Sequence, residues 1–346
     1  MNFEKHIIRK GTSLNDALFQ LNQIVGEKIL FIVDDESRYI GSITDGDIRR
    51  GLIYNSSLEQ KIESFHPEKS KFLSENKSDL EQLIELRDNG FKVIPIVDNQ
   101  KKLKQLIDFN HLKSYLKIDS ITMAGGRGSR LSPLTDKIPK PLLKIGEKPI
   151  MEHNIDRLIS FGIKDFWFSV NYLKEQIKEY FDESKKEIKI RYIEEDQPMG
   201  TIGALSKVEA FQNEHVLITN SDLLTNLNYE DFYLDFLKND ADISIVTIPY
   251  EVVIPYGVVK QKQNQVQGLQ EKPTYTYYSN AGIYLMKREV LASIPQNTFC
   301  NATDLITDEL SKNKKVISYP FSGYWLDIGK PEDYKRAQMD IKHIKF

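Results

Sequence analysis

Cysteine is almost absent from this chain of 346 residues, which contains 1 Cys, 2 Trp and 6 His. The single Cys300 excludes an intramolecular disulfide and a cysteine-rich metal site, so we expect a reducing compartment. No apolar run approaches the ~20 residues of a membrane-spanning helix, and the first residues lack the apolar stretch of a secretory signal. Net charge is also small, −3, because 47 basic residues balance 50 acidic ones, which disfavours nucleic acid and anionic membranes. These absences predict a cytoplasmic protein with no nucleic-acid or membrane partner.

What the chain does contain is an internal repeat near its start. Residues 26–34 (GEKILFIVD) recur as residues 90–98 (GFKVIPIVD), with a constant offset of 64. Helical apolar spacing precedes each copy, and the pattern predicts helix, strand, turn, strand and helix in both. A unit of about 60 residues has a marginal core on its own. We therefore expect the two repeats, about 1–55 and 65–118, to pack together as one module over residues 1–118.

From residue 119 to residue 346, apolar runs alternate with helical segments. This alternation is typical of βαβ units and predicts a mostly parallel sheet with helices on both faces. A helix is expected from Ile202 to about Phe211. Apolar runs separated by turns between residues 256 and 285 predict an antiparallel subregion.

The sharpest motif is a glycine-rich loop after a predicted strand, residues 121–135 (ITMAGGRGSRLSPLT). Glycines let backbone N–H groups approach an anion closely, and an arginine such as Arg130 can bind phosphate oxygens in a bidentate manner. A dinucleotide-binding loop would need glycine at Leu131, and a Walker loop would need Gly-Lys-Ser/Thr. The loop therefore predicts a different phosphate site, or a glycine-rich turn that binds nothing.

Lys140 lies between two prolines in the sequence that follows, PKPLL. Prolines on both sides restrict the backbone around the lysine. A fixed lysine beside a phosphate loop is suited to stabilising charge in phosphoryl transfer, whereas alone it is more often a solvated turn.

The glycine loop and the Pro-Lys-Pro segment together resemble the sugar-1-phosphate nucleotidyltransferase family. The resemblance implies an α/β fold, a Rossmann-like mostly parallel sheet over residues 119–346. It also implies attack of a sugar 1-phosphate on the α-phosphate of an NTP, with Mg²⁺, releasing pyrophosphate. By this resemblance Arg130 grips the pyrophosphate and Lys140 steadies the charge at the α-phosphate. The nucleotide is bound by the loop residues Ala124, Gly125, Gly126 and Gly128.

Two aspartates are similar to the metal ligands of that family. Asp222 follows a predicted strand within Asn-Ser-Asp, where the family has Asn-Gly-Asp, and Asp327 ends Tyr-Trp-Leu-Asp. Two carboxylates with phosphate oxygens and water are sufficient for Mg²⁺. Each alone is equally consistent with a turn or a helix cap.

Three short motifs resemble the part of the family that lines the sugar-phosphate pocket: Tyr-Gly257, Glu271-Lys272-Pro and Asn280-Ala-Gly. By resemblance Lys272 meets the sugar's phosphate, while Glu271, Asn280 and the Gly257 backbone bind hydroxyls. The alternative for Glu271 and Lys272 is a solvated charge pair at a strand end.

The base is predicted from Glu195, which precedes a segment beginning at Gly200 (GTIGAL) that resembles the element beside the base. A carboxylate only accepts hydrogen bonds, and guanine offers N1–H and N2–H together. Thymine and uracil offer one donor flanked by acceptors, so GTP is favoured. Glu194 and Asp196 are alternatives for this role, and the acidic trio could instead face solvent.

Within the first repeat, Gly-Ser-Ile-Thr44-Asp-Gly-Asp47 resembles the ligand motif of CBS domains. The resemblance implies a tandem CBS (α+β) module in which Thr44 contacts phosphate and Asp47 the ribose of an adenosine or guanosine nucleotide. The second repeat has Asp108 and His111 at the equivalent positions, so any such site is single. The alternative is a pair that only dimerises the protein.

This organisation resembles guanylyltransferases that activate amino-hexose or mannose 1-phosphates for surface glycans. The specific expectation is GTP with glucosamine 1-phosphate, as in nonulosonic acid biosynthesis, or with mannose 1-phosphate, in a homo-oligomer. One alternative is a CTP-, UTP- or dTTP-dependent member of the same family. Another is a catalytically inactive nucleotide sensor, which the presence of Arg130, Lys140, Asp222 and Asp327 disfavours.

Overall fold

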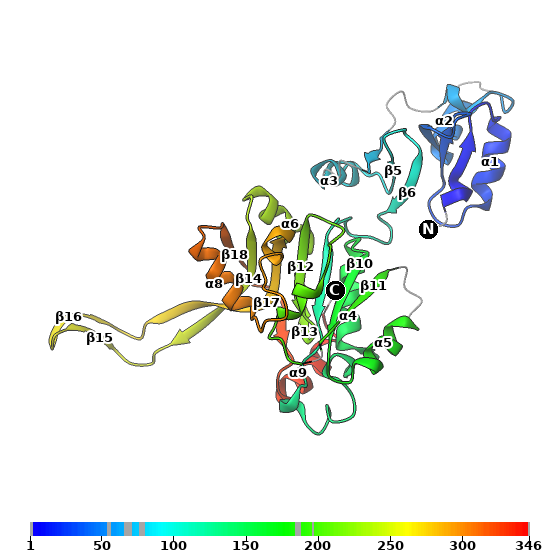
Figure 1. Ribbon diagram of the computed structural model, residues 1–346. Helices are drawn as coiled ribbons and strands as arrows, with labels where there is room; N and C mark the ends of the chain where they lie inside the picture. The colour runs from blue at the N-terminus through cyan, green and yellow to red at the C-terminus, as the bar shows by residue number, and fades with distance from the viewer. Residues whose placement is uncertain are drawn as a thin grey trace. The chain divides into compact units, whose positions relative to one another are not determined.

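The computed structural model describes residues 3–53, 57–65, 71–75, 80–183, 188–195 and 197–344. The chain divides into two compact units, Met1–Leu116 and Lys117–Phe346, each of which is described by itself (Figure 1). In these described ranges, no helix has the length and apolar character needed to cross a membrane.

The amino-terminal unit consists of two small α/β halves that follow the sequence repeat. Each half has a three-stranded sheet in which the central strand pairs parallel with a short first strand and antiparallel with the third. The first half contains β1 Ile7–Arg9, α1 Leu14–Gln23, β2 Ile29–Val33, β3 Tyr39–Thr44 and α2 Asp45–Ile53. The second half contains β4 Leu73–Ser74, α3 Leu80–Asp88, β5 Val93–Val97 and β6 Leu103–Asp108.

The repeat extends to individual hydrogen bonds in the hairpin turns. Asp34 Oδ1 accepts from the Arg38 amide at 2.8 Å, and Asp98 Oδ1 accepts from the Lys102 amide at 2.9 Å. The two halves also share a core, in which Phe31 and Tyr39 pack with Val93, Val97 and Leu106. The expected packing of two marginal repeats against each other is therefore confirmed.

One predicted helix is wrong, because residues 109–118, all of which are described, form no helix after β6. Asp108 Oδ1 accepts from the Asn110 amide at 2.9 Å, and this local bond closes a turn. At the equivalent place in the first half, Thr44 Oγ1 accepts from the Asp47 amide at 3.2 Å at the start of α2. The different side-chain bonds decide whether the chain turns or continues as a helix.

The carboxyl-terminal unit is built on a seven-stranded sheet of order β11-β10-β7-β12-β17-β14-β18. β17 is antiparallel to both of its neighbours, and the other strand pairs are parallel, which confirms the mostly parallel sheet. The strands are β7 Asp119–Met123, β10 Asp165–Val170, β11 Lys189–Glu194, β12 His215–Asn220, β14 Ile243–Val253, β17 Thr274–Lys287 and β18 Val316–Pro320.

Helices cover both faces of this sheet. On one face Phe168 of β10 contacts Phe181 of α5, with ring centroids 5.0 Å apart, and His215 of β12 contacts Phe236 of α6. The other face packs in a core with side chains of α7 and α8. The helices are α4 Ile150–Ser160, α5 Lys174–Asp182, α6 Tyr229–Lys238, α7 Arg288–Leu291, α8 Ala302–Ser311 and α9 Pro331–Asp340.

Two short paired sheets complete the unit, together with a long extension. The short strands are β8 Lys144–Ile145 with β9 Lys148–Pro149, and β13 Leu223–Thr225 with β19 Trp325–Asp327. β14 and β17 continue past the sheet into a two-stranded ribbon of β15 Val258–Lys262 and β16 Gln265–Gln270, which Figure 1 shows extending from the sheet. We call residues 248–279 the arm. The predicted antiparallel subregion is confirmed.

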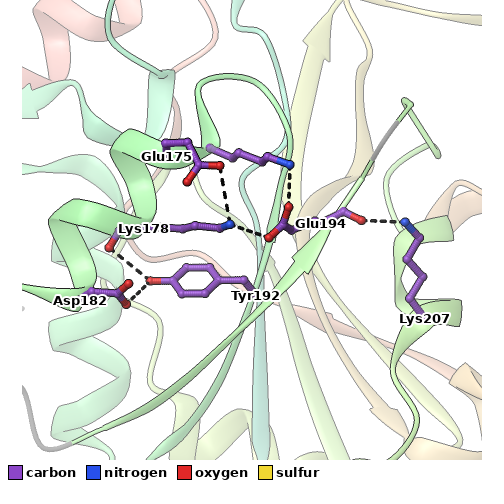
Figure 2. A network of polar contacts seen from close by, with 7 residues as sticks. Glu175, Lys178, Asp182, Tyr192, Glu194 and Lys207 are labelled. Carbon is purple, nitrogen blue, oxygen red and sulfur yellow. Dashed lines mark hydrogen bonds and ion pairs between the residues drawn. The ribbon is translucent and has the colours of Figure 1, made fainter.

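A polar network anchors the carboxyl end of β11 to α5. Glu194 accepts hydrogen bonds from Lys174 and Lys178, and its backbone carbonyl accepts from Lys207 Nζ at 2.7 Å. Figure 2 shows Lys178 between Glu175 and Glu194. The bonds from Lys174 and then Lys178 lower the pKa of Glu194 to about 2. The network therefore holds the strand end that leads directly to Glu195.

Replacing Glu194 with glutamine is expected to cost stability in a pH-dependent way. Because the folded-state pKa lies below the ordinary value, the network stabilises the fold above that value, and the stabilisation is lost as pH falls toward about 2. The exposed ion pairs contribute at most about 1 kcal/mol. Urea unfolding should show Glu194→Gln less stable at neutral pH, with the gap closing below about pH 4.5. Glu175→Gln, at a more exposed member of the network, is the control, and an equal loss at every pH would contradict the assignment.

Candidate active site

The candidate site lies at the carboxyl ends of the parallel strands. Loops that follow β7, β10, β11 and β12 carry Gly125, Asn171, Glu195 and Asp222, respectively. Because parallel strands end at the same edge of a sheet, these loops meet there. They line a cavity of about 690 Å³, large enough for a nucleotide-sized ligand.

The glycine loop packs closely against neighbouring side chains at two positions. A Cβ at Gly125 would lie 3.0 Å from Glu195 Oε1. Gly128 has φ +65°, and a Cβ there would lie 3.0 Å from the Cβ of Lys140. Ala124 is buried and donates its amide to the Ser169 carbonyl at 2.8 Å. The loop therefore runs between Glu195 on one side and Lys140 on the other, with Gly125 and Gly126 lining the cavity.

Lys140 is a buried cation, 8% exposed, that lines the same cavity. It begins the 3-10 helix Lys140–Leu142, and Pro139 before it has extended backbone. Its Nζ forms an ion pair with Asp222 Oδ2. Removing either partner would leave the other charge poorly compensated in a partly buried site.

Asp327 is brought beside Asp222 by the pairing of β13 with β19. Leu223 is the register partner of Asp327, and the Ile328 amide donates to the Asp222 carbonyl at 3.0 Å. Burial, followed by the neighbouring Asp222, raises the pKa of Asp327. The two aspartates that the sequence analysis paired are 105 residues apart in the chain, and this strand pairing brings them close together.

In both aspartates one carboxylate oxygen has no hydrogen-bond partner among the described residues. In the described part of the chain, Oδ1 of Asp222 and Oδ1 of Asp327 are buried without a hydrogen-bond partner. No third His, Cys, Asp or Glu joins them there to form a complete metal cage. Two orphaned carboxylate oxygens fit a hard divalent cation whose remaining ligands come from phosphate and water.

Arg130 lies near Asp327. A Cβ at Gly329 would lie 3.4 Å from Arg130 Nη1, so the guanidinium rests against the backbone just after Asp327. Its charge opposes the rise in the pKa of Asp327. Arg130 does not line the cavity, whereas Arg127 does and lies over the ring of Tyr172, 5.3 Å from its centroid.

Glu195 is the member of the acidic trio that lines the cavity, and it is 8% exposed. Ser169 Oγ donates to its Oε1 at 2.7 Å, and the Met199 amide donates to its Oε2 at 3.2 Å. Glu194 instead belongs to the lysine network, and Asp196 lies outside the described residues. The carboxylate of Glu195 is thus held in place by two neutral donors, and each oxygen has a further lone pair.

The segment after Glu195 is a pinned loop, not the helix expected from Ile202 to about Phe211. Only Gly203–Lys207 forms a 3-10 helix. The amides of Ile202 and Gly203 both donate to the Cys300 carbonyl, and a Cβ at Gly200 would lie 2.5 Å from that oxygen. Bonds to a distant loop replace the local bonds of a helix.

That distant loop contributes a residue that the sequence motifs missed. Phe299 is 61% exposed yet lines the cavity, 99 residues after Gly200. Asn171 and Tyr172 also line the cavity and were missed. No motif marks these residues, because only the packing of their loops brings them to the site. An exposed aromatic face at the rim of a cavity can stack on a base.

The predicted sugar-side residues are not gathered in this cavity. Gly257, Glu271 and Lys272 lie on the exposed arm, where a Cβ at Gly257 would be 3.0 Å from Glu271 Oε2. Asn280 lies nearer the sheet and donates from Nδ2 to the Tyr284 hydroxyl at 2.8 Å. The structure therefore groups Gly257 with Glu271 but does not bring them to Lys140.

In the amino-terminal unit, Thr44 and Asp47 are bonded to each other. Asp47 Oδ2 accepts from the Thr44 hydroxyl at 2.6 Å and from its amide at 2.8 Å. Arg50 Nη2 donates to Asp47 Oδ1 at 2.6 Å. The pair caps α2 in this structure, and a nucleotide would have to replace these contacts.

Known proteins match both parts of the chain. Residues 2–54 match the CBS domain. The mannose-1-phosphate guanyltransferase of Yarrowia lipolytica is 31% identical over 232 residues, which cover 62% of this chain and 61% of the relative. The chain thus spans about three fifths of the length of the first curated relatives. The D-glycero-alpha-D-manno-heptose 1-phosphate guanylyltransferase of Aneurinibacillus thermoaerophilus is 29% identical, over 65% of this chain and 99% of the relative.

Solved structures show the same fold for the carboxyl-terminal unit. A Bacillus anthracis crystal structure in complex with sucrose aligns with TM-score 0.54 and 22% identity over 66% of this chain and 97% of that chain, and this likeness concerns the fold alone. HddC from Yersinia pseudotuberculosis complexed with GMP-PN aligns with TM-score 0.51 and 25% identity over 65% of this chain and 99% of that chain. The Nucleotidyl transferase family model matches residues 119–344, and the chain belongs to that family.

Proposed function

We propose that the carboxyl-terminal unit transfers a nucleotidyl group from an NTP to a sugar 1-phosphate. A phosphate oxygen of the sugar 1-phosphate attacks the α-phosphorus, a new P–O bond forms, and the bond to the bridging oxygen breaks. Pyrophosphate leaves with that electron pair, so no further reactant is needed. The observation that carries the proposal is the single cavity that holds the glycine loop, the Lys140–Asp222 pair and Glu195.

The charges on the phosphate side have separate roles in this reaction. Backbone N–H groups of the glycine loop bind the phosphates, and Lys140 stabilises the negative charge that develops at the α-phosphate. Arg130 binds the departing pyrophosphate. Asp222 and Asp327 would hold Mg²⁺, which when bound neutralises and polarises phosphate oxygens. The orphaned oxygens of the two carboxylates support this assignment.

GTP is the proposed nucleotide. The N1–H and N2–H of guanine match the two oxygens of Glu195, which Ser169 and Met199 hold in position. The guanylyltransferase names of the relatives and the GMP-PN complex of a structural neighbour support the same base. CTP, UTP and dTTP remain the competing donors.

The proposed acceptor is a hexose 1-phosphate, mannose or glucosamine 1-phosphate, for surface-glycan synthesis. The relatives are named for mannose and heptose 1-phosphates. An inactive sensor is disfavoured, because the lysine and both aspartates are present and adjacent. The amino-terminal unit is proposed to be a tandem CBS module that binds one adenosine or guanosine nucleotide at Thr44 and Asp47.

A panel of four NTPs against several sugar 1-phosphates tests the proposal through pyrophosphate release in the presence of Mg²⁺. We expect turnover with GTP and at least one hexose 1-phosphate, and loss of turnover when EDTA removes the metal. Release with no combination contradicts the activity. A better rate with another NTP contradicts only the choice of base.

Substituting Glu195→Gln should weaken discrimination in favour of GTP. A glutamine donates as well as accepts, so it loses one bond to guanine and can pair with uracil or thymine. We expect kcat/KM for GTP to fall ~10- to 100-fold, and the GTP:UTP ratio to fall by more. Glu209→Gln, at an exposed glutamate that does not line this cavity, is the matched control and should keep the ratio. An unchanged ratio in Glu195→Gln would remove this residue from base selection.

Loss of either charge of the Lys140–Asp222 pair should abolish most of the rate. Lys140→Ala and Asp222→Asn are each expected to lower kcat by at least ~10²-fold, because each removes a preorganised charge from the reacting phosphates. Asp222→Asn should also raise the Mg²⁺ concentration that gives half-maximal rate. Lys144→Ala, four residues from Lys140 and exposed, serves as the control. Thermal unfolding separates misfolding from catalysis, and near-normal turnover in a folded Lys140→Ala or Asp222→Asn variant would refute the assignment.

Phe299→Ala should raise the KM for GTP ~5- to 100-fold with a smaller change in kcat, because base stacking on an aromatic ring contributes about 1–3 kcal/mol. Phe299→Tyr keeps the ring and should restore the KM. A KM that is the same in all three proteins would show that the ring does not contact the base.

A further inference from the structure

One face of α4 holds both ends of the segment that follows Asp222. Asn154 of α4 is 4% exposed, and its Nδ2 donates to the Leu223 carbonyl at 2.8 Å. Arg157, which is also buried, donates from Nη2 to the Leu227 carbonyl. Residues three apart on a helix lie on the same face. Two side chains of one helix face therefore fix the backbone at residues 223 and 227.

The same helix holds the segment that follows Lys140. The first residue of α4 donates its amide to the Leu143 carbonyl at 3.0 Å. One turn further along the helix, His153 Nε2 hydrogen-bonds to the Ile145 carbonyl at 2.8 Å. Helix α4 is thus a common support for two segments of the chain, of which one carries Lys140 and the other carries Asp222.

Asp222 needs such a support because the strand that follows it is short. β13 has 3 residues, and it forms a two-stranded sheet with β19. A two-stranded pair is marginally stable by itself in water. The bond from Asn154 reaches the carbonyl of residue 223, one position after the aspartate, and both of its partners are buried. A displacement of that carbonyl would move the Asp222 carboxylate relative to Asp327.

We propose that Asn154 is a positioning residue, which holds Asp222 where its orphaned oxygen and that of Asp327 can bind one divalent cation. The proposal rests on the proposed function, in which these two carboxylates hold Mg²⁺. Asn154 does not line the cavity and acts through the Leu223 carbonyl. Mutation of the residues that support metal ligands typically lowers metal affinity about 10- to 100-fold.

The test separates binding of the cation from binding of the nucleotide, in the full chain. Equilibrium dialysis measures the affinity for GTP with Mn²⁺ and with EDTA, in the absence of a sugar 1-phosphate, so that no turnover occurs. We call the ratio of these two affinities the Mn²⁺ gain. Asn154→Leu and Asn154→Asp keep a similar side-chain size but lack the amide donor. Both are expected to bind GTP in EDTA as the wild type does, with a Mn²⁺ gain that is at least ~10-fold smaller.

Leu291→Ala is the control for a general loss of stability. Leu291 is buried in a different core cluster from the one that contains Leu224 and Ile328, the neighbours of β13 and β19. Its truncation leaves a cavity, so the melting temperature should fall at least as far as in the Asn154 variants. The Mn²⁺ gain of this control should equal that of the wild type.

The outcomes distinguish the role of Asn154 from the proposed function. An equal Mn²⁺ gain in the wild type and in both Asn154 variants would overturn the positioning role and leave the proposed function intact. Failure of both variants to fold would also overturn it, because Asn154 would then serve the fold alone, and so would a reduced Mn²⁺ gain in Leu291→Ala. A wild type that binds no GTP, or that gains nothing from Mn²⁺, would contradict the proposed function and with it the role of Asn154.

Discussion

The candidate site depends on one ion pair between the buried Lys140 and the partly buried Asp222. A lysine that is 8% exposed loses most of its hydration, and the carboxylates beside it compensate for that loss. The prolines beside Lys140 restrict its backbone, and Gly128 packs closely against its side chain. Together these two constraints fix the position of the lysine. With Asp327 present the three groups carry a net negative charge, which suits a site that receives a cation together with its phosphates.

Different kinds of interaction position the side chains at the two ends of the cavity. At the proposed phosphate end charged groups dominate: Lys140 and Asp222 line the cavity, and Asp327 lies beside Asp222 with Arg130 nearby. At the proposed base end Glu195 is held by two neutral donors, the Ser169 hydroxyl and the Met199 amide. The network of Glu194 with Lys174 and Lys178 supports this end from outside the cavity.

The arm and the amino-terminal unit lie outside the cavity and add separate features. The arm carries Glu271 and Lys272, and exposed apolar side chains lie on both of its faces. In the amino-terminal unit, two marginal repeats become stable by sharing a core. Thr44 and Asp47, which resemble a ligand motif, hydrogen-bond to each other at the start of α2.

The sequence alone determined the features that depend on short-range patterns. Apolar periodicity located the central strands of both repeats and of the large sheet, and the glycine loop with Lys140 indicated phosphate chemistry. The local sequence pattern predicted the wrong structure where backbone groups distant in the sequence replace local hydrogen bonds. The amides of Ile202 and Gly203 donate to the Cys300 carbonyl, so the predicted helix does not form there. The resemblance had already paired Asp222 with Asp327, and the structure shows the strand pairing that brings them together. Only the tertiary structure decided that Phe299 reaches the cavity and that Glu271 and Lys272 do not line it. These placements depend on how strands pair and loops pack between residues about a hundred positions apart in the chain. No repeat or spacing within a short segment reports the free energy of that long-range packing.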